Sequence, residues 1–372
     1  MNCSAFAARL LRWFERRKRD LPWRREPRDP YQVWLSEVML QQTQVATVIP
    51  YFERWLRRFP TLEALADAPL DDVLKLWEGL GYYARARNLH ATAQIVVRDH
   101  GGQLPRTVEG LMALPGIGRY TAGAIASLAF GAHTPAPDGN ARRVLSRVFG
   151  LSRPTAAELW ALAESLLPRG RAGAFNEALM ELGATTCTPR APQCAACPLR
   201  AMCKARAGGD PEAYPARPTR QKTPHHEALT VVLVDGAGRA LLGQRPPDGL
   251  LGGLWEFISA ELRAPDANAQ SGSGAAPCPA DLADLILRRS GLKVKPSHAQ
   301  PLGAVKHAFT HFKLTRQVWL VRLPKPARAP LRPRGYERLI WATPEEVEQL
   351  ALTRSDRRIW AMYRARPPAL FD

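Results

Sequence analysis

Cysteine and acidic side chains are scarce in this chain. Only 6 of its 372 residues are cysteines, and 34 Asp and Glu stand against 52 Lys and Arg, which leaves a formal net charge of +18. A long chain with few cysteines and no secretory signal indicates reducing surroundings rather than a disulfide framework. The deficit of negative charge favours a polyanionic partner over a small neutral one. Charge alone does not decide the partner, because a chain this rich in Ala and Pro can owe some of its arginine to genomic base composition.

Long apolar runs are also absent. No stretch approaches the length of a membrane span, and residues 1–20 contain Glu15 and a basic run in place of the apolar core of a signal peptide. This segment is typical of a surface amphipathic helix, with its inward face formed by Phe6, Leu10, Trp13 and Phe14. We therefore expect a cytoplasmic protein without a membrane partner, associated with the nucleoid if it is bacterial. We also expect a monomer.

Four of the cysteines lie within seventeen residues: Cys187, Cys194, Cys197 and Cys203. Thiolates spaced this closely can surround one metal centre without help from distant parts of the chain, and a shell of four thiolates suits a [4Fe–4S] cluster or zinc. Zinc usually takes two short C-x-x-C pairs, and only Cys194 and Cys197 form one. The spacing therefore favours the cluster, while zinc, disulfides and plain buried thiols stay open as alternatives.

The periodicity of the apolar residues divides the chain. Residues 1–186 are helical almost throughout and predict an all-α domain, which the cysteine loop at 187–206 follows. Residues 207–224 contain Gly208, Gly209 and several prolines without apolar periodicity, which indicates a linker. Residues 225–372 alternate between strands and turns before two terminal helices, which indicates an α+β domain.

The individual elements follow from the same periods. Helices are predicted at residues 30–42, 70–80, 83–100, 107–113, 119–130, 141–149, 155–167, 174–182, 344–350 and 354–363. Strands are predicted at residues 228–234, 239–244, 302–309 and 314–323. Residues 264–280 contain alternating Ser and Gly and predict a flexible loop inserted in the second domain.

Residues 114–118, Leu-Pro-Gly-Ile-Gly, join two predicted helices by a tight turn. Gly116 and Gly118, on either side of Ile117, let the backbone approach a ligand closely, and the next helix N-terminus points free N–H groups outward. A phosphate group fits such a place. Turns of this kind also occur between helices for packing alone, so the motif does not establish phosphate binding by itself.

Two carboxylates are notable for their surroundings. Glu37 lies in the apolar helical segment 33–40, where desolvation favours the protonated acid, which can donate a proton. Asp138 directly precedes a predicted helix, where the helix dipole and free N–H groups favour the ionised carboxylate, which can stabilise a cation. Taken alone, Asp138 also fits a plain N-cap and Glu37 a solvent-facing residue. Together, one protonated and one ionised carboxylate suit the cleavage of a glycosidic bond through an oxocarbenium-like transition state.

Five motifs occur in order within residues 20–203. They are residues 34–45 (WLSEVMLQQTQV), 79–89 (GLGYYARARNL), 114–118 (LPGIG), 138–140 (DGN) and the four cysteines. In this combination the chain resembles the MutY-type adenine DNA glycosylases, helix–hairpin–helix enzymes with a [4Fe–4S] cluster that remove adenine mispaired with 8-oxoguanine or guanine. The resemblance implies a multidomain fold: an all-α helix–hairpin–helix glycosylase domain with an iron–sulfur cluster loop, then an α+β Nudix-like domain.

The resemblance also implies roles for residues near the chemistry. Glu37 would be the general acid that protonates the adenine leaving group. Asp138 would stabilise the sugar cation, with support from Asn140. Tyr120 would assist at the active site, and Glu177 would lie near the adenine.

Other residues of the motifs are implied to contact double-stranded DNA. Gln42 and Tyr82 would enter the duplex as the adenine flips out, because a planar or amide side chain can fill the gap in the stack. Without the resemblance, Tyr82 is typical of an ordinary core tyrosine at a helix start.

Particular residues argue against two alternative functions of the helical domain. Bifunctional relatives resembling endonuclease III carry a lysine two residues beyond the second hairpin glycine, because its amine must form a Schiff base. Here that position is Tyr120, which predicts a monofunctional enzyme that uses water and leaves an abasic site. A DNA-binding scaffold without activity would lack the paired carboxylates Glu37 and Asp138.

The second domain begins with a different resemblance. Residues 249–257 resemble the entry to a Nudix fold, whose hydrolases hold a divalent metal with clustered glutamates. Arg288 and Arg289 occupy the places of paired acidic residues, which argues against a pyrophosphohydrolase. The resemblance implies instead that a loop at residues 309–311 recognises 8-oxoguanine through Thr310, where the family often has serine, and His311. By residue type alone, that histidine is typical of a surface position.

Overall fold

The computed structural model describes residues 3–216, 223–262, 279–295, 299–327 and 330–366. Within these residues the chain forms two compact units, which comprise Met1–Asp67 with Asn88–Arg220, and Ala68–Arg87 with Gln221–Asp372. The short segment Ala68–Arg87 thus groups with the strand-rich part, which the sequence did not predict. Two ion pairs inside that unit, Glu78 with Arg357 and Asp71 with Arg338, join the segment to the strand-rich part. No helix of the described residues is long and apolar enough to cross a membrane.

The first unit is built of helices, as predicted. Its longer elements are α1 (Cys3–Arg17), α2 (Pro30–Leu40), α3 (Val45–Arg58), most of α6 (Ala84–His100), α8 (Arg119–Phe130), α9 (Gly139–Phe149), α10 (Ala156–Ser165) and α11 (Ala172–Thr185). Its short elements are η1 (Pro22–Arg24), α4 (Leu62–Ala66), α7 (Val108–Met112), η2 (Cys194–Ala196), η3 (Arg200–Met202), α12 (Lys204–Ala207) and η4 (Pro211–Ala213). The sequence did not predict α3, since Pro50 lies inside it and a proline usually ends or kinks a helix.

The apolar faces of α1, α9, α10 and α11 form one core. Phe6, Leu10 and Phe14 of α1 are buried there as predicted, whereas Trp13 is only partly buried at its edge. Helices α9 and α11 approach each other closely at Gly183, where an added Cβ would lie 2.9 Å from the backbone oxygen of Asn140. This contact sets the beginning of α9 against α11.

Residues 207–216 of the predicted linker at 207–224 contact the first unit. Arg147 donates to the backbone oxygen of Tyr214 at 3.1 Å, and the N–H of Ala216 donates to the backbone oxygen of Ser152 at 2.7 Å. These contacts hold the segment to the first unit, although it has no apolar periodicity of its own. The loop predicted at 264–280 lies almost wholly outside the described residues.

Within its described residues the second unit forms a six-stranded mixed sheet in the order β4-β5-β1-β3-β2-β6. The strands are β1 (His225–Val234), β2 (Ala240–Gln244), β3 (Trp255–Leu262), β4 (Gln300–Ala308), β5 (Lys313–Arg322) and β6 (Arg338–Ala342). Strands β1 and β5 are parallel, and the other neighbours are antiparallel. The sequence did not predict β3, because a central strand buried on both faces lacks alternation of apolar and polar residues.

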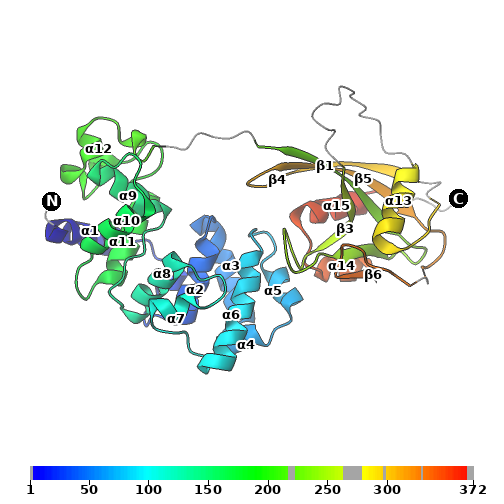
Figure 1. Cartoon of the computed structure of the whole chain (residues 1–372), viewed down its shortest axis with the longest axis horizontal. Coiled ribbons are helices and arrows are strands. Elements are labelled where there is room, and N and C mark those ends of the chain that lie inside the picture. The colour runs from blue at the N-terminus through cyan, green and yellow to red at the C-terminus, as the bar shows by residue number, and fades with distance from the viewer. Residues whose placement is uncertain (1–2, 217–222, 263–278, 296–298, 328–329, 367–372) are drawn as a thin grey trace. The chain divides into compact units, whose positions relative to one another are not determined.

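Helices cover both faces of this sheet (Figure 1). On one face α13 (Pro279–Ser290) contributes Leu282, Leu285 and Ile286 to the core. On the other face, α14 (Pro344–Gln349) and α15 (Arg354–Arg364) contribute Val347 and Trp360. The segment Ala68–Arg87 adds α5 (Leu70–Leu76) to this unit. The prediction of an α+β domain is thereby confirmed.

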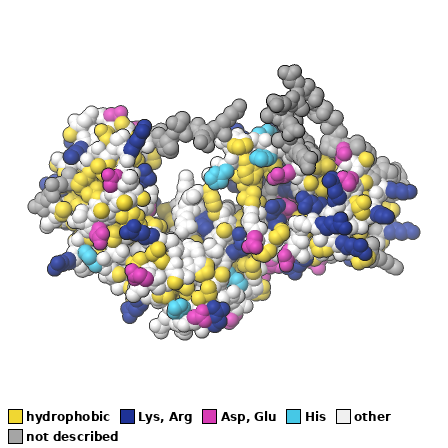
Figure 2. Space-filling model, in the orientation of Figure 1, with side chains coloured by type: hydrophobic (Ala, Val, Ile, Leu, Met, Phe, Trp, Pro, Cys, Tyr) yellow, Lys and Arg dark blue, Asp and Glu magenta, His cyan; other side chains and the backbone are white. Residues whose placement is uncertain are grey.

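Figure 2 shows Lys and Arg side chains exposed on both units of the visible face, with Asp and Glu side chains among them. The net charge of +18 is therefore not confined to one unit.

Candidate active site

A pocket of about 1270 Å³ opens in the first unit among η1, α2, α8, α9 and α11. The structure brings together on its lining the predicted residues Glu37, Gln42, Tyr120, Asp138, Asn140 and Glu177. These residues come from segments more than a hundred positions apart. The fold of the first unit thus assembles the residues that the sequence singled out near the chemistry.

Glu37 is buried on α2, with only 6% of its surface exposed, so the solvent-facing alternative is excluded. Burial raises the pKa of its carboxyl to about 7. The Tyr120 hydroxyl donates to Glu37 Oε2 at 2.6 Å and lowers that pKa, while the charges of Asp138 and Glu177 raise it and that of Arg24 lowers it. Glu37 is therefore a carboxyl that can hold a proton near neutral pH, as expected from its apolar surroundings.

Asp138 is the N-cap of α9. Its Oδ1 accepts from the backbone N–H of Ala141 at 2.7 Å, and its Oδ2 accepts from Asn140 Nδ2 at 2.9 Å. The sequence predicted that this position favours the ionised form, and that stays a prediction. Burial raises the pKa of Asp138 more than these hydrogen bonds lower it, so the pKa lies above its usual value. The hydrogen bonds still favour an anion at this place, but against a desolvation cost that the sequence did not reveal.

A chain of hydrogen bonds leads from Asp138 toward the cysteine loop. Asn140, which donates to Asp138, accepts from Arg143 Nη2 at 2.9 Å. Arg143 also donates to the backbone oxygens of Gly183 and Cys187, each at 2.7 Å. Hydrogen bonds through Asn140 and Arg143 therefore connect Asp138 to the backbone of Cys187, the first cysteine of the loop.

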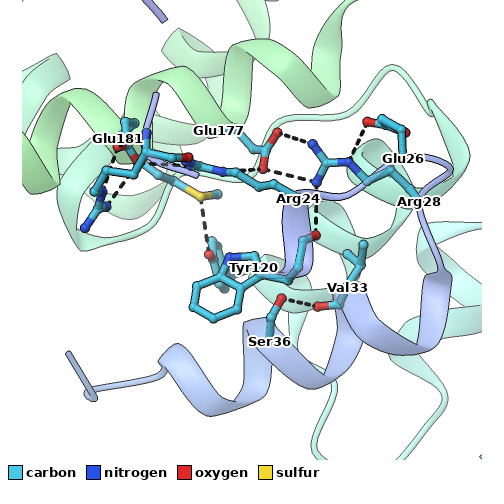
Figure 3. A network of polar contacts seen from close by, with 11 residues as sticks. Arg24, Glu26, Arg28, Val33, Ser36, Tyr120, Glu177 and Glu181 are labelled. Carbon is cyan, nitrogen blue, oxygen red and sulfur yellow. Dashed lines mark hydrogen bonds and ion pairs between the residues drawn. The ribbon is translucent and has the colours of Figure 1, made fainter. Parts of the chain in front are cut away.

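A network of ion pairs forms one wall of the pocket (Figure 3). Glu177 and Glu181, one turn apart on α11, accept hydrogen bonds from Arg19, Arg24 and Arg28. Sequence reasoning named Glu177 from the resemblance alone and missed the other four residues. The sequence did contain a signal for Glu181. Two glutamates four positions apart in the apolar segment 174–182 would be buried with it, and buried carboxylates need partners.

The four cysteines border a second cavity of the first unit, together with Arg147 and Arg206. Arg147 Nη1 lies 3.4 Å from the sulfur of Cys187 and donates to the backbone oxygen of Thr188 at 2.7 Å. Burial raises the pKa of the Cys197 thiol to about 11. In the part of the chain that the structure describes, no group of three or more His, Cys, Asp or Glu side chains is placed to hold a single metal ion.

The predicted turn at 114–118 lies between α7 and α8. Gly116 has a φ of +73°, and a Cβ there would lie 2.5 Å from Asn88 Nδ2, so no other residue fits without rearrangement. Gly118 is the N-cap of α8 and has no side-chain cap, which leaves N–H groups of the first turn facing outward. Ile117 as a whole is buried, whereas Gly116 and Gly118 on either side of it are exposed, so a ligand at this turn would meet the two glycines.

Gln42 and Tyr82 share an uncommon backbone conformation. Their φ angles are +57° and +49°, in the left-handed region that side chains other than glycine seldom adopt. Tyr82 is 44% exposed, which rules out the core tyrosine that its sequence context alone suggests. Strain of this kind persists where a side chain must point in a set direction, as at binding sites.

The predicted loop at 309–311 is a tight turn of the second unit between β4 and β5. The N–H of Phe309 donates to the oxygen of Phe312 at 2.8 Å, and the two rings stack with centroids 4.5 Å apart. Thr310 and His311 are exposed at the tip. The Thr310 hydroxyl hydrogen-bonds the hydroxyl of Tyr82, so the structure brings two predicted DNA-contacting residues of this unit together.

The arginines that replace acidic residues lie at the end of α13. Arg288 pairs with Asp284, and Arg289 lies over the ring of Tyr336 and donates to the backbone oxygen of Arg334. These positions contribute cations where a divalent metal would need carboxylates.

Two family models match this chain. Residues 35–169 match the HhH-GPD superfamily base excision DNA repair proteins, and residues 229–362 match the NUDIX domain. A solved thermostable thymine-DNA glycosylase is 32% identical, with a TM-score of 0.52 over 55% of this chain and 97% of that one. The class is therefore that of helix–hairpin–helix base excision repair proteins, here followed by a Nudix-like domain, which confirms the predicted fold.

Curated relatives narrow the class to one family. The adenine DNA glycosylase of Homo sapiens is 38% identical over 98% of this chain and 75% of its own length. That of Mus musculus is 40% identical over 97% of this chain and 78% of its own length. The chain belongs to the adenine DNA glycosylase family of base excision repair enzymes.

Proposed function

We propose that this chain hydrolyses the N-glycosidic bond of adenine mispaired with 8-oxoguanine or guanine in duplex DNA and leaves an abasic site. The observation that carries the proposal is a buried Glu37, with a pKa of about 7, in the same pocket as the N-capping carboxylate of Asp138. One group can give a proton and the other can face a cation, which is what this bond cleavage requires.

The steps follow from the two carboxylates. Glu37 donates its proton to the flipped adenine, and the bond from the sugar to the base breaks with its electron pair leaving on the base. The oxocarbenium-like cation that remains is stabilised by Asp138, which Asn140 and the N–H of Ala141 orient. Water then adds to the sugar carbon, and the proton that the water loses returns to Glu37.

The same site supports a monofunctional reaction. Tyr120 stands where a lyase needs its lysine, and its hydroxyl donates to Glu37 instead. Burial raises the pKa of Tyr120 well above its usual value, so the phenol remains a donor and not a nucleophile. Strand cleavage by this protein alone is not expected.

We propose that Cys187, Cys194, Cys197 and Cys203 hold a [4Fe–4S] cluster at the second cavity. The donor set is four thiols that border a single cavity, and Arg147 lies within reach of one sulfur. Bound there, the cluster would hold the loop from 187 to 203 in place. About four iron and four sulfide per anaerobically purified chain would support the assignment, and stoichiometric zinc without iron would reject it.

Recognition of 8-oxoguanine is proposed for the second unit. Support comes from the exposed turn with Thr310 and His311 and from its hydrogen bond to Tyr82, the side chain proposed to enter the duplex. Gln42 is proposed to enter it as well, while Gly116, Ile117 and Gly118 would bind a DNA phosphate through their backbone. We expect no hydrolysis of nucleoside diphosphates, given Arg288 and Arg289. The cytoplasmic location and the monomeric state stay predictions.

The activity is tested on a duplex with one adenine opposite 8-oxoguanine. Strand breakage is compared with and without hot alkali, because an abasic site breaks only under alkali. After incubation with the protein, the strand should break only in the sample that is also treated with alkali. Borohydride treatment should trap no covalent adduct between the protein and the DNA. Breakage without alkali would contradict the monofunctional assignment, and an intact strand in both samples would contradict the proposed activity.

A further inference from the structure

Glu181 is the most deeply buried member of the ion-pair network, with 1% of its side chain exposed. Its Oε1 accepts from Arg19 Nε at 2.7 Å and from the Arg19 backbone N–H at 3.1 Å. Its Oε2 accepts from Nη2 of Arg19 and Nη2 of Arg24, each at 3.0 Å. None of the catalytic roles proposed above uses this carboxylate.

Arg24 connects Glu181 to Glu177, as Figure 3 shows. Its Nε donates to Glu177 Oε1 at 3.1 Å, and its Nη1 donates to the backbone oxygen of Arg19 at 3.1 Å. With the bond from Nη2 to Glu181, each nitrogen of the guanidinium has an acceptor. The planar guanidinium is therefore held from three directions. Arg28 binds the opposite side of Glu177 through two further hydrogen bonds.

The position of Arg24 matters because Arg24 and Glu37 line the same pocket and the charge of Arg24 acts on Glu37. The charged and titratable groups that act on Glu37 come from several elements: Tyr120 of α8, Asp138 at the start of α9, Glu177 of α11 and Arg24 of η1. The positive charge of Arg24 favours loss of the Glu37 proton, and Glu181 offsets that charge. Water screens charges weakly in a buried site, so removing the Glu181 charge would strengthen the effect of Arg24 on Glu37.

We propose that Glu181 is a positioning residue for adenine excision, which holds Arg24 against Glu177 and offsets its positive charge in the pocket that contains Glu37. The inference rests on the proposed function, because it concerns the proton that Glu37 donates.

The test is Glu181→Gln in the full-length protein, which keeps the size of the side chain and removes its charge. Adenine release under single-turnover conditions is measured across about pH 5 to 9, the range in which such a carboxyl titrates. The rate constant at neutral pH should fall about tenfold, the size of one lost hydrogen bond between charged groups. The pH of half-maximal rate should move lower, while affinity for a duplex without adenine stays within about twofold.

Glu26→Gln is the matched control in the same network. Glu26 accepts from Arg28 Nε at 2.8 Å, but its side chain is 70% exposed. An exposed ion pair is screened by water and contributes little. This variant should keep the rate constant and the pH profile of the wild type.

Glu181→Asp tests the same idea if the glutamine variant does not fold. It keeps the charge and shortens the reach, so it should lower the rate constant while leaving the pH of half-maximal rate near that of the wild type. The inference is contradicted if Glu181→Gln retains the wild-type rate, or if it loses rate with an unchanged pH profile. It is also contradicted if Glu181→Asp retains the full rate. A wild-type protein that releases no adenine contradicts the proposed function instead.

Discussion

At the scale of single residues, the site uses the same chemical group twice in different surroundings. Glu37 accepts a hydrogen bond from the Tyr120 hydroxyl inside an apolar helix, whereas Asp138 accepts from a backbone N–H and an amide at a helix start. Burial raises the pKa of both carboxyls, and their hydrogen bonds lower it. Burial outweighs the single hydroxyl donor at Glu37, whose pKa of about 7 lets it carry a proton, while the N–H donors at Asp138 favour the anion.

The raised pKa of Glu37 predicts how excision depends on pH. A general acid acts in its protonated form, and burial brings the pKa of Glu37 to about 7. The rate constant for adenine release should therefore decline as the pH rises through about 7. Single-turnover rates in buffers of constant ionic strength measure this. A rate that rises across the same range would assign the proton donation to another group.

At the scale of elements, helix starts and close helix contacts position the chemistry. Asp138 caps α9 and Gly118 begins α8, so two helix N-termini supply N–H groups to the proposed DNA-binding surface of the first unit. Gly183 allows α11 to approach the start of α9. Asp138 and Glu177 thereby face one pocket although they lie on different helices.

Gly183→Ala should separate these two helices. The added methyl would lie 2.9 Å from the backbone oxygen of Asn140, which cannot move without displacing the α9 start. We expect a loss of about 1–3 kcal/mol in the free energy of unfolding, together with slower adenine release. Gly208→Ala is the control, because a Cβ there meets ordinary contacts at 3.6 Å or more. Unchanged stability and rate in Gly183→Ala would show that the close approach does not position Asp138.

Much of the element pattern could be predicted from the sequence, and the exceptions have physical reasons. Pro50 hid α3, and β3 lacks the alternation that identifies a strand because Trp255–Ile258 are all buried. Helix α13 and strand β6 were not predicted from the sequence either. Glu37 stood out because its neighbours along the helix are apolar. Arg24 and Arg28 did not, since they lie in a basic stretch whose partners on α11 are about 150 positions away, and only the fold brings them together.

At the scale of the whole molecule, chemistry and recognition are proposed to reside in different units. Glu37 and Asp138 belong to the first unit, while Tyr82 and Thr310 belong to the second. That Tyr82 belongs to the second unit could not be predicted, because the motif that contains it is continuous in sequence with the helical domain. The desolvation that raises the pKa of Asp138 was likewise hidden, since it depends on the pocket that the fold forms around this residue.

Thr310→Ala should reduce the preference for adenine opposite 8-oxoguanine over adenine opposite guanine. The change removes one hydroxyl among several contacts, so the ratio of the two excision rates should fall about two- to tenfold. Thr310→Ser is the matched control, because it keeps the hydroxyl and should keep the ratio. An alanine variant with the wild-type ratio would place recognition elsewhere.

The central claim, that Glu37 donates the proton that releases adenine, is tested most directly by Glu37→Gln. The amide keeps the shape of the side chain but cannot give the proton, so duplex binding should persist while adenine release falls by about 100-fold or more. Single-turnover release from a duplex with adenine opposite 8-oxoguanine, measured beside the affinity for the same duplex, decides the question. Background release with retained binding is the predicted result, and appreciable release by the variant would contradict the account.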